Sequence, residues 1–358
     1  MSPPSHAWGW RAPSTRLVGA LLVLAIVGSA LTMTLSPGDT SPLLWELLVS
    51  LLALFCRLKA AFQISVETIG KVSVVAASVL TALLWTDLGV IKMGARRHLE
   101  IGGWLLQPSI FWVLACHCTA ASVASGTRKH WPWLVVALLG ATFASLAMPE
   151  LSIVPQVLAG LLVIGWVTGR RRIAMAALVF IGLAIALSAL LPYVQRRWIG
   201  FLDPDAHARG AGYDYRALGK LVEQSRWWGS PDGSMPRTSS PSDDYWFAAA
   251  MWRFGRIPLV VWFLGLLATL RSTFKSVTAV PEERALLAKA SAAAIAATLF
   301  IHAGYNVGFW PITAISAPFS GVAGGATAMT LFALSFGVAQ RSPSEPQPRP
   351  RSEYPPKS

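Results

Sequence analysis

An aspartate and two arginine pairs are the residues of this chain best suited by type and spacing to chemistry. Asp244 ends a polar stretch, and an apolar run that begins Tyr245-Trp246-Phe247 follows it directly. A carboxylate at such a boundary can serve as a general base, because partial burial and neighbouring charge tune its pKa. Asp243 could take the same place, and capping a helix start is the alternative role for the pair.

The two arginine pairs are Arg96-Arg97 and Arg196-Arg197. A guanidinium group can bind phosphate oxygens through two parallel N–H bonds, so each pair could hold a diphosphate. Anchoring to anionic lipid headgroups is the alternative.

The segment 194–244 is the one long polar stretch in a chain otherwise built of apolar runs. From Arg196 to Asp244 it holds seven Lys or Arg and seven Asp or Glu, so its net charge is zero. A charge-balanced loop rich in Trp could form the wall of a polar cavity at a membrane face. A solvated loop is the alternative, because loops are polar by default.

The composition indicates that lipid is the main solvent around this chain. Of its 358 residues, 54% are hydrophobic and 13% are charged, whereas soluble domains carry roughly 25% charged residues. Ten apolar runs are candidate spans, several of them near the roughly 20 residues that a spanning helix needs. They cover residues 17–35, 42–62, 72–91, 104–125, 133–149, 151–168, 173–193, 245–270, 287–309 and 315–340.

These runs predict an all-α, polytopic membrane protein with about ten transmembrane helices. The segment 194–244 becomes one large extracytoplasmic loop between helices 7 and 8. The apolar part of the eighth run, Ile257 to Leu270, is too short to span a bilayer alone. We therefore expect Tyr245–Arg256 to be helical as well, with a kink at Pro258.

Lys and Arg residues are divided unequally between alternate loops. Of the 30, eighteen fall on the side of the N-terminus and twelve on the other. The excess of positive charge on cytoplasmic loops predicts that both termini are cytoplasmic and that the long loop faces outward. Residues 1–14 and 341–358 are then cytoplasmic tails on a transmembrane domain at 15–340. The second tail, which is rich in proline, is expected to be disordered.

Other ligands are not favoured by the sequence. The net charge of +13 comes from short basic clusters without a long basic patch, so we expect no nucleic-acid partner. Cys56, Cys116 and Cys118 lie in or beside apolar runs, which favours packing over a disulfide framework or a metal site. His117 and His302 are expected to be neutral, hydrogen-bonded packing residues.

Four segments of the chain form a set of motifs. They are Gly94-Ala95-Arg96-Arg97-His98-Leu99 with Gln107-Pro108-Ser109; Arg196-Arg197-Trp198 with Phe201-Leu202-Asp203-Pro204 and Gly212-Tyr213; Asp244-Tyr245-Trp246-Phe247-Ala248 with Phe254-Gly255; and Asn306 with Pro311, Thr313, Pro318-Phe319 and Gly324-Gly325. Together they resemble the SEDS family (shape, elongation, division and sporulation), which includes FtsW, RodA and SpoVE. The first is similar to the family's G-A-R-R-W and Q-P-S-E-x-x-K motifs, and the third to its D-F-I-F-A motif. The order of the segments and the ten predicted helices agree with the family.

The chain also departs from the family's motifs. Ile110 and Val113 occupy the Glu and Lys positions of Q-P-S-E-x-x-K, and Trp252 and Arg253 replace a pair of Glu. The retained Asp244 and the arginines favour an active enzyme. The lost acidic and Lys positions favour a protein in which catalysis is impaired.

The resemblance implies a peptidoglycan glycosyltransferase that polymerises lipid-linked disaccharide-peptide in cell division or cell shape control. Asp244 would be catalytic. The residues implied to bind diphosphate or sugar are Arg96, Arg97, Arg196, Arg197, Gln107, Ser109 and Trp198. Trp198, with Trp227 and Trp228, could instead belong to an interfacial belt. A divalent cation such as Mg²⁺ or Mn²⁺ on the diphosphate is implied in the same way.

The resemblance also implies partners and a location in the bacterial inner membrane. The partners are a class B penicillin-binding protein transpeptidase and other division or elongation proteins. Small residues at 287–300 would let a partner helix approach closely, and internal packing is the alternative use of that face. Two other functions stay open: a catalytically impaired scaffold for a cell-wall transpeptidase, and a transporter of lipid-linked precursor.

Overall fold

The computed structural model describes residues 13–35, 64–92, 95–101, 104–126, 130–148, 151–238, 244–276, 282–313, 315 and 317–319. The predicted run at 42–62, nearly all of that at 315–340 and the tail at 341–358 lie outside the described residues. So do most of the tail at 1–14, Asp243, Cys56 and Gly324-Gly325.

Helices account for most of the described chain. In order, the elements are α1 (Pro13–Leu35), α3 (Val66–Leu83), β1 (Gly89–Lys92), β2 (Ala95–Ile101), β3 (Trp104–Leu106), α4 (Ser109–Ala124), α5 (Trp131–Ala147), α6 (Ile153–Thr168), α7 (Arg171–Ser188), α8 (Pro192–Leu202), α9 (Tyr213–Gln224), α10 (Trp246–Phe254), α11 (Arg256–Ser276) and α12 (Glu282–Asn306). Among the described residues, four helices are long and apolar enough to cross a membrane: Val66–Leu83, Arg171–Ser188, Arg256–Phe274 and Glu282–Asn306. The prediction of a mainly helical membrane protein is confirmed, and the count of ten spans stays a prediction.

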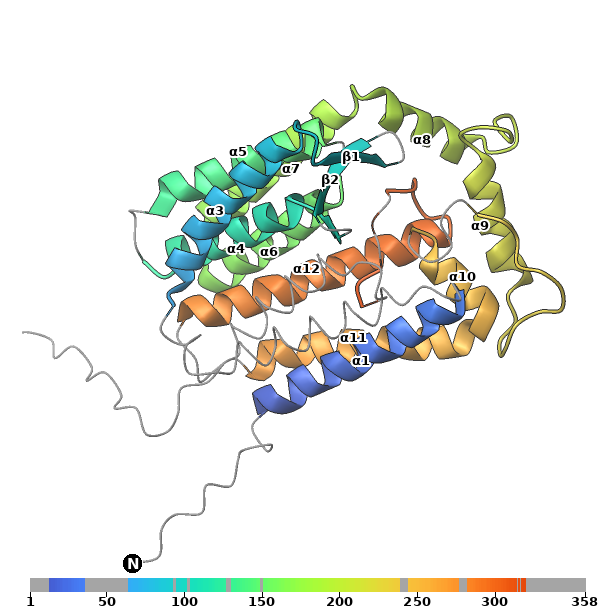
Figure 1. Cartoon of the computed structure of the whole chain (residues 1–358). Helices are drawn as coiled ribbons and strands as arrows, with labels where there is room; N and C mark the ends of the chain where they lie inside the picture. The colour runs from blue at the N-terminus through green and yellow to red at the C-terminus, as the bar shows by residue number, and fades with distance from the viewer. Residues whose placement is uncertain are drawn as a thin grey trace, which may run out of the picture.

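Helix α12 lies between two groups of helices. On one side it packs against α4 and α6, which belong to a bundle with α3, α5 and α7. On the other side it packs against α10 and α11, and α1 covers those two. Figure 1 shows this order, with α12 in orange between the blue-green bundle and the pair α1 and α11. Because both groups contact α12, this helix can couple their positions.

The small residues of α12 are used inside the molecule. Ala288, Ala290, Ser291, Ala292 and Ala294 are each at most 1% exposed, and α12 contacts α6 more closely than any other helix. Small side chains allow helix backbones to approach each other. Ala290 packs in the core formed with α4 and α6, while Ala288 and Ala292 pack in the core shared with α10 and α11. These five buried residues therefore serve internal packing, the alternative use of this stretch, and a partner helix against the rest of it stays a prediction.

The expectation of an all-α fold is wrong at one place, because residues 89–106 form a three-stranded antiparallel sheet. Gly89 pairs with Leu99, and Leu99 pairs with Leu106. Helix α3 ends at Leu83, and a turn follows in which a Cβ on Gly89 would lie 1.9 Å from the Leu84 carbonyl oxygen. The helices predicted at 72–91 and 104–125 are shorter for this reason, and the sheet connects α3 to α4.

The eighth predicted run is two helices that meet at Gly255. Gly255 has φ +97°, and a Cβ there would lie 2.7 Å from the Trp227 carbonyl oxygen, so the position requires glycine. The predicted kink at Pro258 is wrong, because Pro258 lies in the first turn of α11, where its missing N–H costs no helix bond. Helix α11 continues to Ser276 and reaches spanning length without α10.

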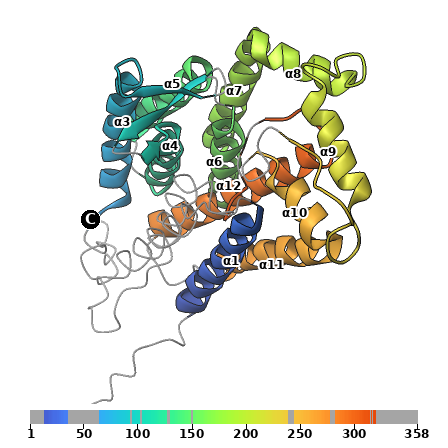
Figure 2. The ribbon, with the colours of Figure 1, turned by 45° about the vertical axis from the view of Figure 1, so that its right-hand side comes forward.

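The segment 194–244 is partly helical and lies at one end of the bundle. Helices α8 and α9 contact each other, and α9 contacts α10. Figures 1 and 2 show α8, α9, α10 and the sheet at the same end, where α3 and α12 finish. The polar stretch therefore covers the end at which Asp244 lies.

Candidate active site

Asp244 is buried at the entrance to α10, with 5% of its surface exposed. Its backbone carbonyl accepts hydrogen bonds from the Tyr305 hydroxyl at 2.7 Å and from Nδ2 of Asn306 at 3.1 Å. Both donors are themselves fully buried near the end of α12. The carboxylate is thus attached to a backbone that a central helix holds in place.

Side chains of α12 also cap the start of α10. The N-cap residue is Tyr245, whose side chain makes no capping bond. The N–H of Phe247 donates instead to Nε2 of His302 at 3.3 Å, and the N–H of Ala248 to Oδ1 of Asn306 at 3.1 Å. These are the amides that an N-cap side chain normally satisfies. Side chains of α12 therefore supply these two capping bonds of α10.

The hydrogen bonds of His302 determine the protonation state of its imidazole ring. Because Nε2 accepts from a backbone N–H, the imidazole proton must reside on Nδ1 and the ring must be neutral. Nδ1 lies 2.5 Å from the Ile315 carbonyl and 2.9 Å from the Tyr305 hydroxyl. His117 is held similarly, with Nε2 3.1 Å from the Gln156 carbonyl. The prediction that both histidines are hydrogen-bonded packing residues is confirmed.

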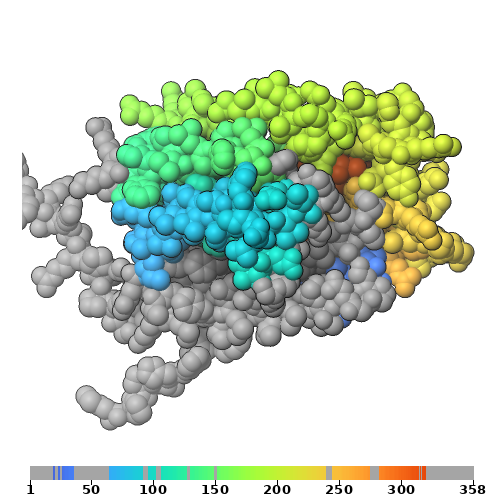
Figure 3. All heavy atoms as spheres, turned by 45° about the horizontal axis from the view of Figure 1, so that its top comes forward, coloured from blue at the N-terminus to red at the C-terminus, as the bar shows by residue number. Residues whose placement is uncertain are grey.

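The segment after α12 joins α8 and α9 to this network. Arg197 Nη1 donates to the Ile312 carbonyl at 3.0 Å, and the Ile312 N–H donates to the Tyr215 hydroxyl at 2.9 Å. That hydroxyl donates in turn to the Arg197 carbonyl at 3.0 Å. Burial raises the pKa of Tyr215 above its ordinary value, which keeps the hydroxyl protonated as a donor. In Figure 3 a small red patch of this segment lies against the yellow-green atoms of the 194–238 region.

The other predicted ligands of this loop face outward. Arg196 is exposed, and Trp198 is 50% exposed, with its ring 6.1 Å from that of Phe201 in an edge-on contact. Trp227 and Trp228 are each 66% exposed. The structure therefore connects Arg197 to the segment that follows α12, while Arg196 and the tryptophans remain open to a ligand or to lipid headgroups.

The residues of the first arginine pair lie on β2, next to the ends of α3 and α4. Arg96 Nη1 donates to the Leu84 carbonyl at 3.2 Å, at the C-terminus of α3. Arg97 Nε is buried, and so is Oγ of Ser109 in the first turn of α4; neither has a hydrogen-bond partner among the described residues. Gln107 is half-buried between β3 and α4. No described contact joins this group to Asp244.

A protein-held metal finds no ligand set in the described part of the chain. No group of three or more His, Cys, Asp or Glu side chains there could hold a metal ion. The buried Cys116 and Cys118 are free thiols in the core of α4, as their predicted packing role requires.

Two residues of the site were not predicted from the sequence. Tyr305 and Tyr215 make bonds that hold Asp244 and Arg197, yet neither stood out in the sequence. A signal existed for Tyr305, because His302, Tyr305 and Asn306 share one helix face at spacings of three and four residues. Tyr215 had no comparable signal, since its partners are distant in sequence.

The fold and this site define a polytopic membrane protein whose buried carboxylate lies between a polar segment and a central helix. The chain belongs to the FtsW, RodA and SpoVE family of cell cycle proteins, because the family model matches residues 15–342. It is 28% identical over 204 residues to the "Probable peptidoglycan glycosyltransferase FtsW" of Synechocystis, covering 53% of this chain and 52% of that protein. It is 24% identical over 273 residues to the stage V sporulation protein E of Bacillus subtilis, covering 72% and 74%. The chain thus spans about half the length of the first of these relatives.

Solved structures share the fold. A chain of a peptidoglycan synthase complex, described as coordinating polymerization and crosslinking, superposes with a TM-score of 0.68 at 19% identity and covers 90% of this chain and 96% of its own. A mutant of the rod shape determining protein RodA of Thermus thermophilus superposes with a TM-score of 0.59 at 18% identity, covering 93% and 97%. At these identities the likeness establishes the architecture alone.

Proposed function

We propose that this chain is a SEDS-type peptidoglycan glycosyltransferase that polymerises lipid-linked disaccharide-peptide into glycan strands. The observation that carries the proposal is the position of Asp244. Its backbone is fixed by Tyr305 and Asn306 at the junction of the polar segment and the helical bundle. A base held in this way needs little reorganisation when the substrate arrives.

The reaction that fits this site is a displacement at a sugar carbon. The carboxylate of Asp244 accepts the proton of the acceptor 4-hydroxyl while that oxygen attacks the anomeric carbon of the donor. The bond from this carbon to the diphosphate oxygen breaks with inversion, and polyprenyl diphosphate leaves with the electron pair. General-base help of this kind contributes about 10²- to 10⁴-fold in rate.

The arginines divide their roles in this proposal. Arg197 holds α8 through Ile312, so its exposed neighbour Arg196 is free to contact substrate, with Trp198 beside it. Arg96 and Arg97 bind the departing diphosphate through charge-assisted bonds. Buried polar atoms without partners require an explanation, and a ligand at the start of α4 would supply partners for Arg97 Nε and Ser109 Oγ.

The membrane arrangement follows from the same proposal. Ten helices at 15–340 cross the bacterial inner membrane, both termini are cytoplasmic, and the loop at 194–244 is extracytoplasmic. The substrate approaches from that side, where α8, α9 and the sheet lie together. A class B penicillin-binding protein and other division or elongation proteins are the proposed partners.

A polymerisation assay tests the proposed function. The purified full-length chain is incubated with lipid-linked disaccharide-peptide, and the products are separated by gel electrophoresis. We expect glycan strands that a muramidase degrades. If a monodisperse preparation makes no strands, alone or with a co-purified transpeptidase, the transferase proposal fails.

A scaffold for a cell-wall transpeptidase is the second candidate function, and one observation favours it. Ile110 and Val113, at the Glu and Lys positions of the family motif, are each 6% exposed, and Val113 packs in the apolar core of the bundle. Buried apolar side chains therefore stand where the family motif has a charged Glu and Lys. In cells, a scaffold predicts that Asp244→Asn supports growth as well as the unmodified chain while deletion does not, whereas a transferase predicts that both changes fail.

A further inference from the structure

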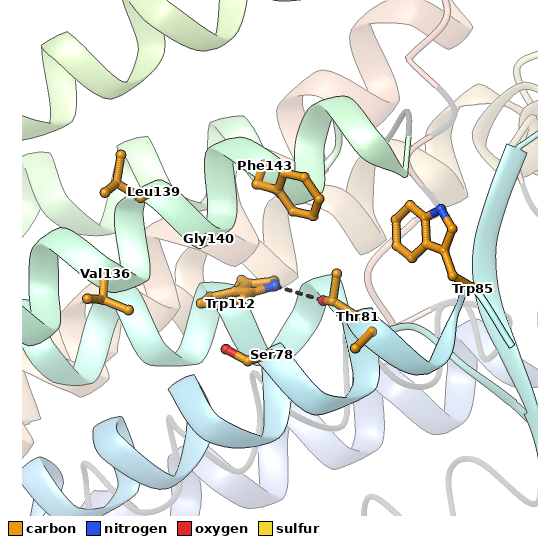
Figure 4. A pocket seen from close by; sticks show the side chains of 9 residues that line it. Ser78, Thr81, Trp85, Trp112, Val136, Leu139, Gly140 and Phe143 are labelled. Carbon is orange, nitrogen blue, oxygen red and sulfur yellow. Dashed lines mark hydrogen bonds between the residues drawn. The ribbon is translucent and has the colours of Figure 1, made fainter.

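An apolar groove runs along the last two turns of α3, between α3 and α5, with α4 as its floor. Its volume is about 610 Å³, and its walls include Ala82 on α3, Trp112 on α4 and Leu139 on α5. Figure 4 shows Trp85 at one end of the groove, beside the sheet. None of these residues belongs to the site described above.

The groove offers mainly carbon atoms to an occupant, because most of its lining side chains are apolar and two of its polar donors are bonded within the protein. The Trp112 indole N–H donates to the Thr81 hydroxyl at 3.1 Å, as Figure 4 shows, and the Ser78 hydroxyl donates to the Val74 carbonyl at 2.8 Å. A Cβ on Gly140 would lie 2.2 Å from the Trp112 ring, so this glycine makes room for the indole. The floor is therefore a flat aromatic surface whose indole N–H is already bonded.

The size of the groove suits a hydrocarbon chain better than a helix. The lining residues from Val136 to Phe143 are seven residue steps apart on α5, or roughly 10 Å along the helix. A transmembrane helix would need contact along much of the roughly 30 Å hydrocarbon core. Trp85, Leu139 and Phe143 are 54%, 60% and 55% exposed, so a chain can enter from the bilayer.

A cation lies at one end of this groove. Arg96 Nη1 bonds to the carbonyl of Leu84, the residue before Trp85. An occupant with an anionic head at Arg96 would therefore have its hydrocarbon at the groove. We propose that the groove holds the polyprenyl chain of the diphosphate-linked substrate, an inference that rests on the proposed function. Binding of the apolar tail in the groove would then select polyprenyl-linked diphosphates for binding at Arg96.

Photocrosslinking tests this assignment on the purified full-length chain. The probe is a geranylgeranyl diphosphate analogue with a diazirine on its chain. We expect labelled peptides from α3 and α5, and about tenfold weaker labelling in Ala82→Trp, since excluding even two methylene groups from the groove forfeits roughly that factor. The control is Val79→Trp, which changes an exposed position of α3 outside the groove. Leu139→Trp is a second groove variant should Ala82→Trp fail to accumulate.

The outcomes separate this inference from the proposed function. Any of three results would overturn the groove assignment. The probe could label peptides outside α3 and α5, it could label the groove and control variants equally, or excess phosphatidylglycerol could compete with the probe as well as excess unlabelled prenyl diphosphate does. Strand synthesis with any of those results would leave the transferase proposal intact. The chain could also make no strands while the probe labels the groove, with weaker labelling in Ala82→Trp and Leu139→Trp. That result would support the prenyl site and contradict only the transferase proposal.

Discussion

His302, Tyr305 and Asn306 occupy one face of α12, and all three side chains bond at the start of α10. Asn306 bonds in two directions, since Oδ1 accepts from Ala248 while Nδ2 donates to the Asp244 carbonyl. These side chains take the part that an N-cap residue plays in most helices. At the residue scale, the position of Asp244 therefore depends on a helix that is sixty residues away in sequence.

Replacing Asn306 tests this dependence. Asn306→Ala leaves the buried Ala248 N–H without its acceptor, so we expect a loss of about 1–3 kcal/mol in the free energy of unfolding. A shift of about 1 Å in Asp244 would lower the polymerisation rate by about 10²-fold. Thermal unfolding and kcat, with KM measured separately, check both effects.

The matched control is Thr298→Ala on the same helix. The Thr298 hydroxyl is buried but bonds only to the Ala294 carbonyl of its own helix, at 2.9 Å. We expect near-normal kcat in this variant. A similar loss of kcat in both variants would mean that α12 acts through general stability and does not position Asp244.

The residue types of the site were predictable in part. Asp244, Arg197 and Asn306 belong to segments that resemble family motifs, and the structure places all three in or beside one hydrogen-bond network. The roles of Tyr305 and Tyr215 were not predictable, because each depends on a tertiary contact. The different roles of Arg196 and Arg197 could not be predicted without the fold either, because adjacent residues of α8 face different surroundings.

At the scale of elements, Tyr215 attaches α9 to α8 and to the segment after α12. Tyr215→Phe removes the acceptor of the buried Ile312 N–H and the donor to the Arg197 carbonyl. We expect a loss of about 1–3 kcal/mol and faster hydrogen exchange at Ile312. Tyr213→Phe is the control, because its hydroxyl makes an exposed bond of 3.3 Å to Arg237.

The same bond predicts a pH dependence. The pKa of Tyr215 is raised above 10.0 by burial, so the hydroxyl's contribution is complete below the unfolded-state value and is lost as pH rises through the folded-state value. The stability difference between the unmodified chain and Tyr215→Phe should therefore shrink above about pH 10. A difference that stays constant or grows with alkaline pH would contradict the assigned bond.

Hydropathy predicted the existence of the described helices better than their ends. The runs at 151–168 and 287–309 correspond to α6 and α12, because continuous apolar stretches in lipid have few alternatives to a helix. The sheet at 89–106 was missed because its strands continue apolar runs at both ends. The helices α8 and α9 were missed because they carry too much charge for a search based on hydropathy.

At the scale of the whole molecule, α12 lies between two helical groups, and the polar segment covers one end of both. This arrangement predicts that the covered end faces outward. Reporter fusions after Arg172 and after Arg341 should report a cytoplasmic location, and a fusion near Gly233 an extracytoplasmic one. A cytoplasmic signal at Gly233 would place Asp244 on the wrong side for a surface polymer and would overturn the proposed topology.

The most direct test of the central claim is the polymerisation rate of Asp244→Asn. This change keeps the size and polarity of the side chain and removes the proton acceptor. We expect a loss of about 10²- to 10⁴-fold at normal membrane abundance. Asp232→Asn, at an exposed carboxylate paired with Arg226 in the same segment, should polymerise at nearly the unmodified rate, as should Asp243→Asn. Small and equal effects at Asp243 and Asp244 would contradict the assignment of Asp244 as the base.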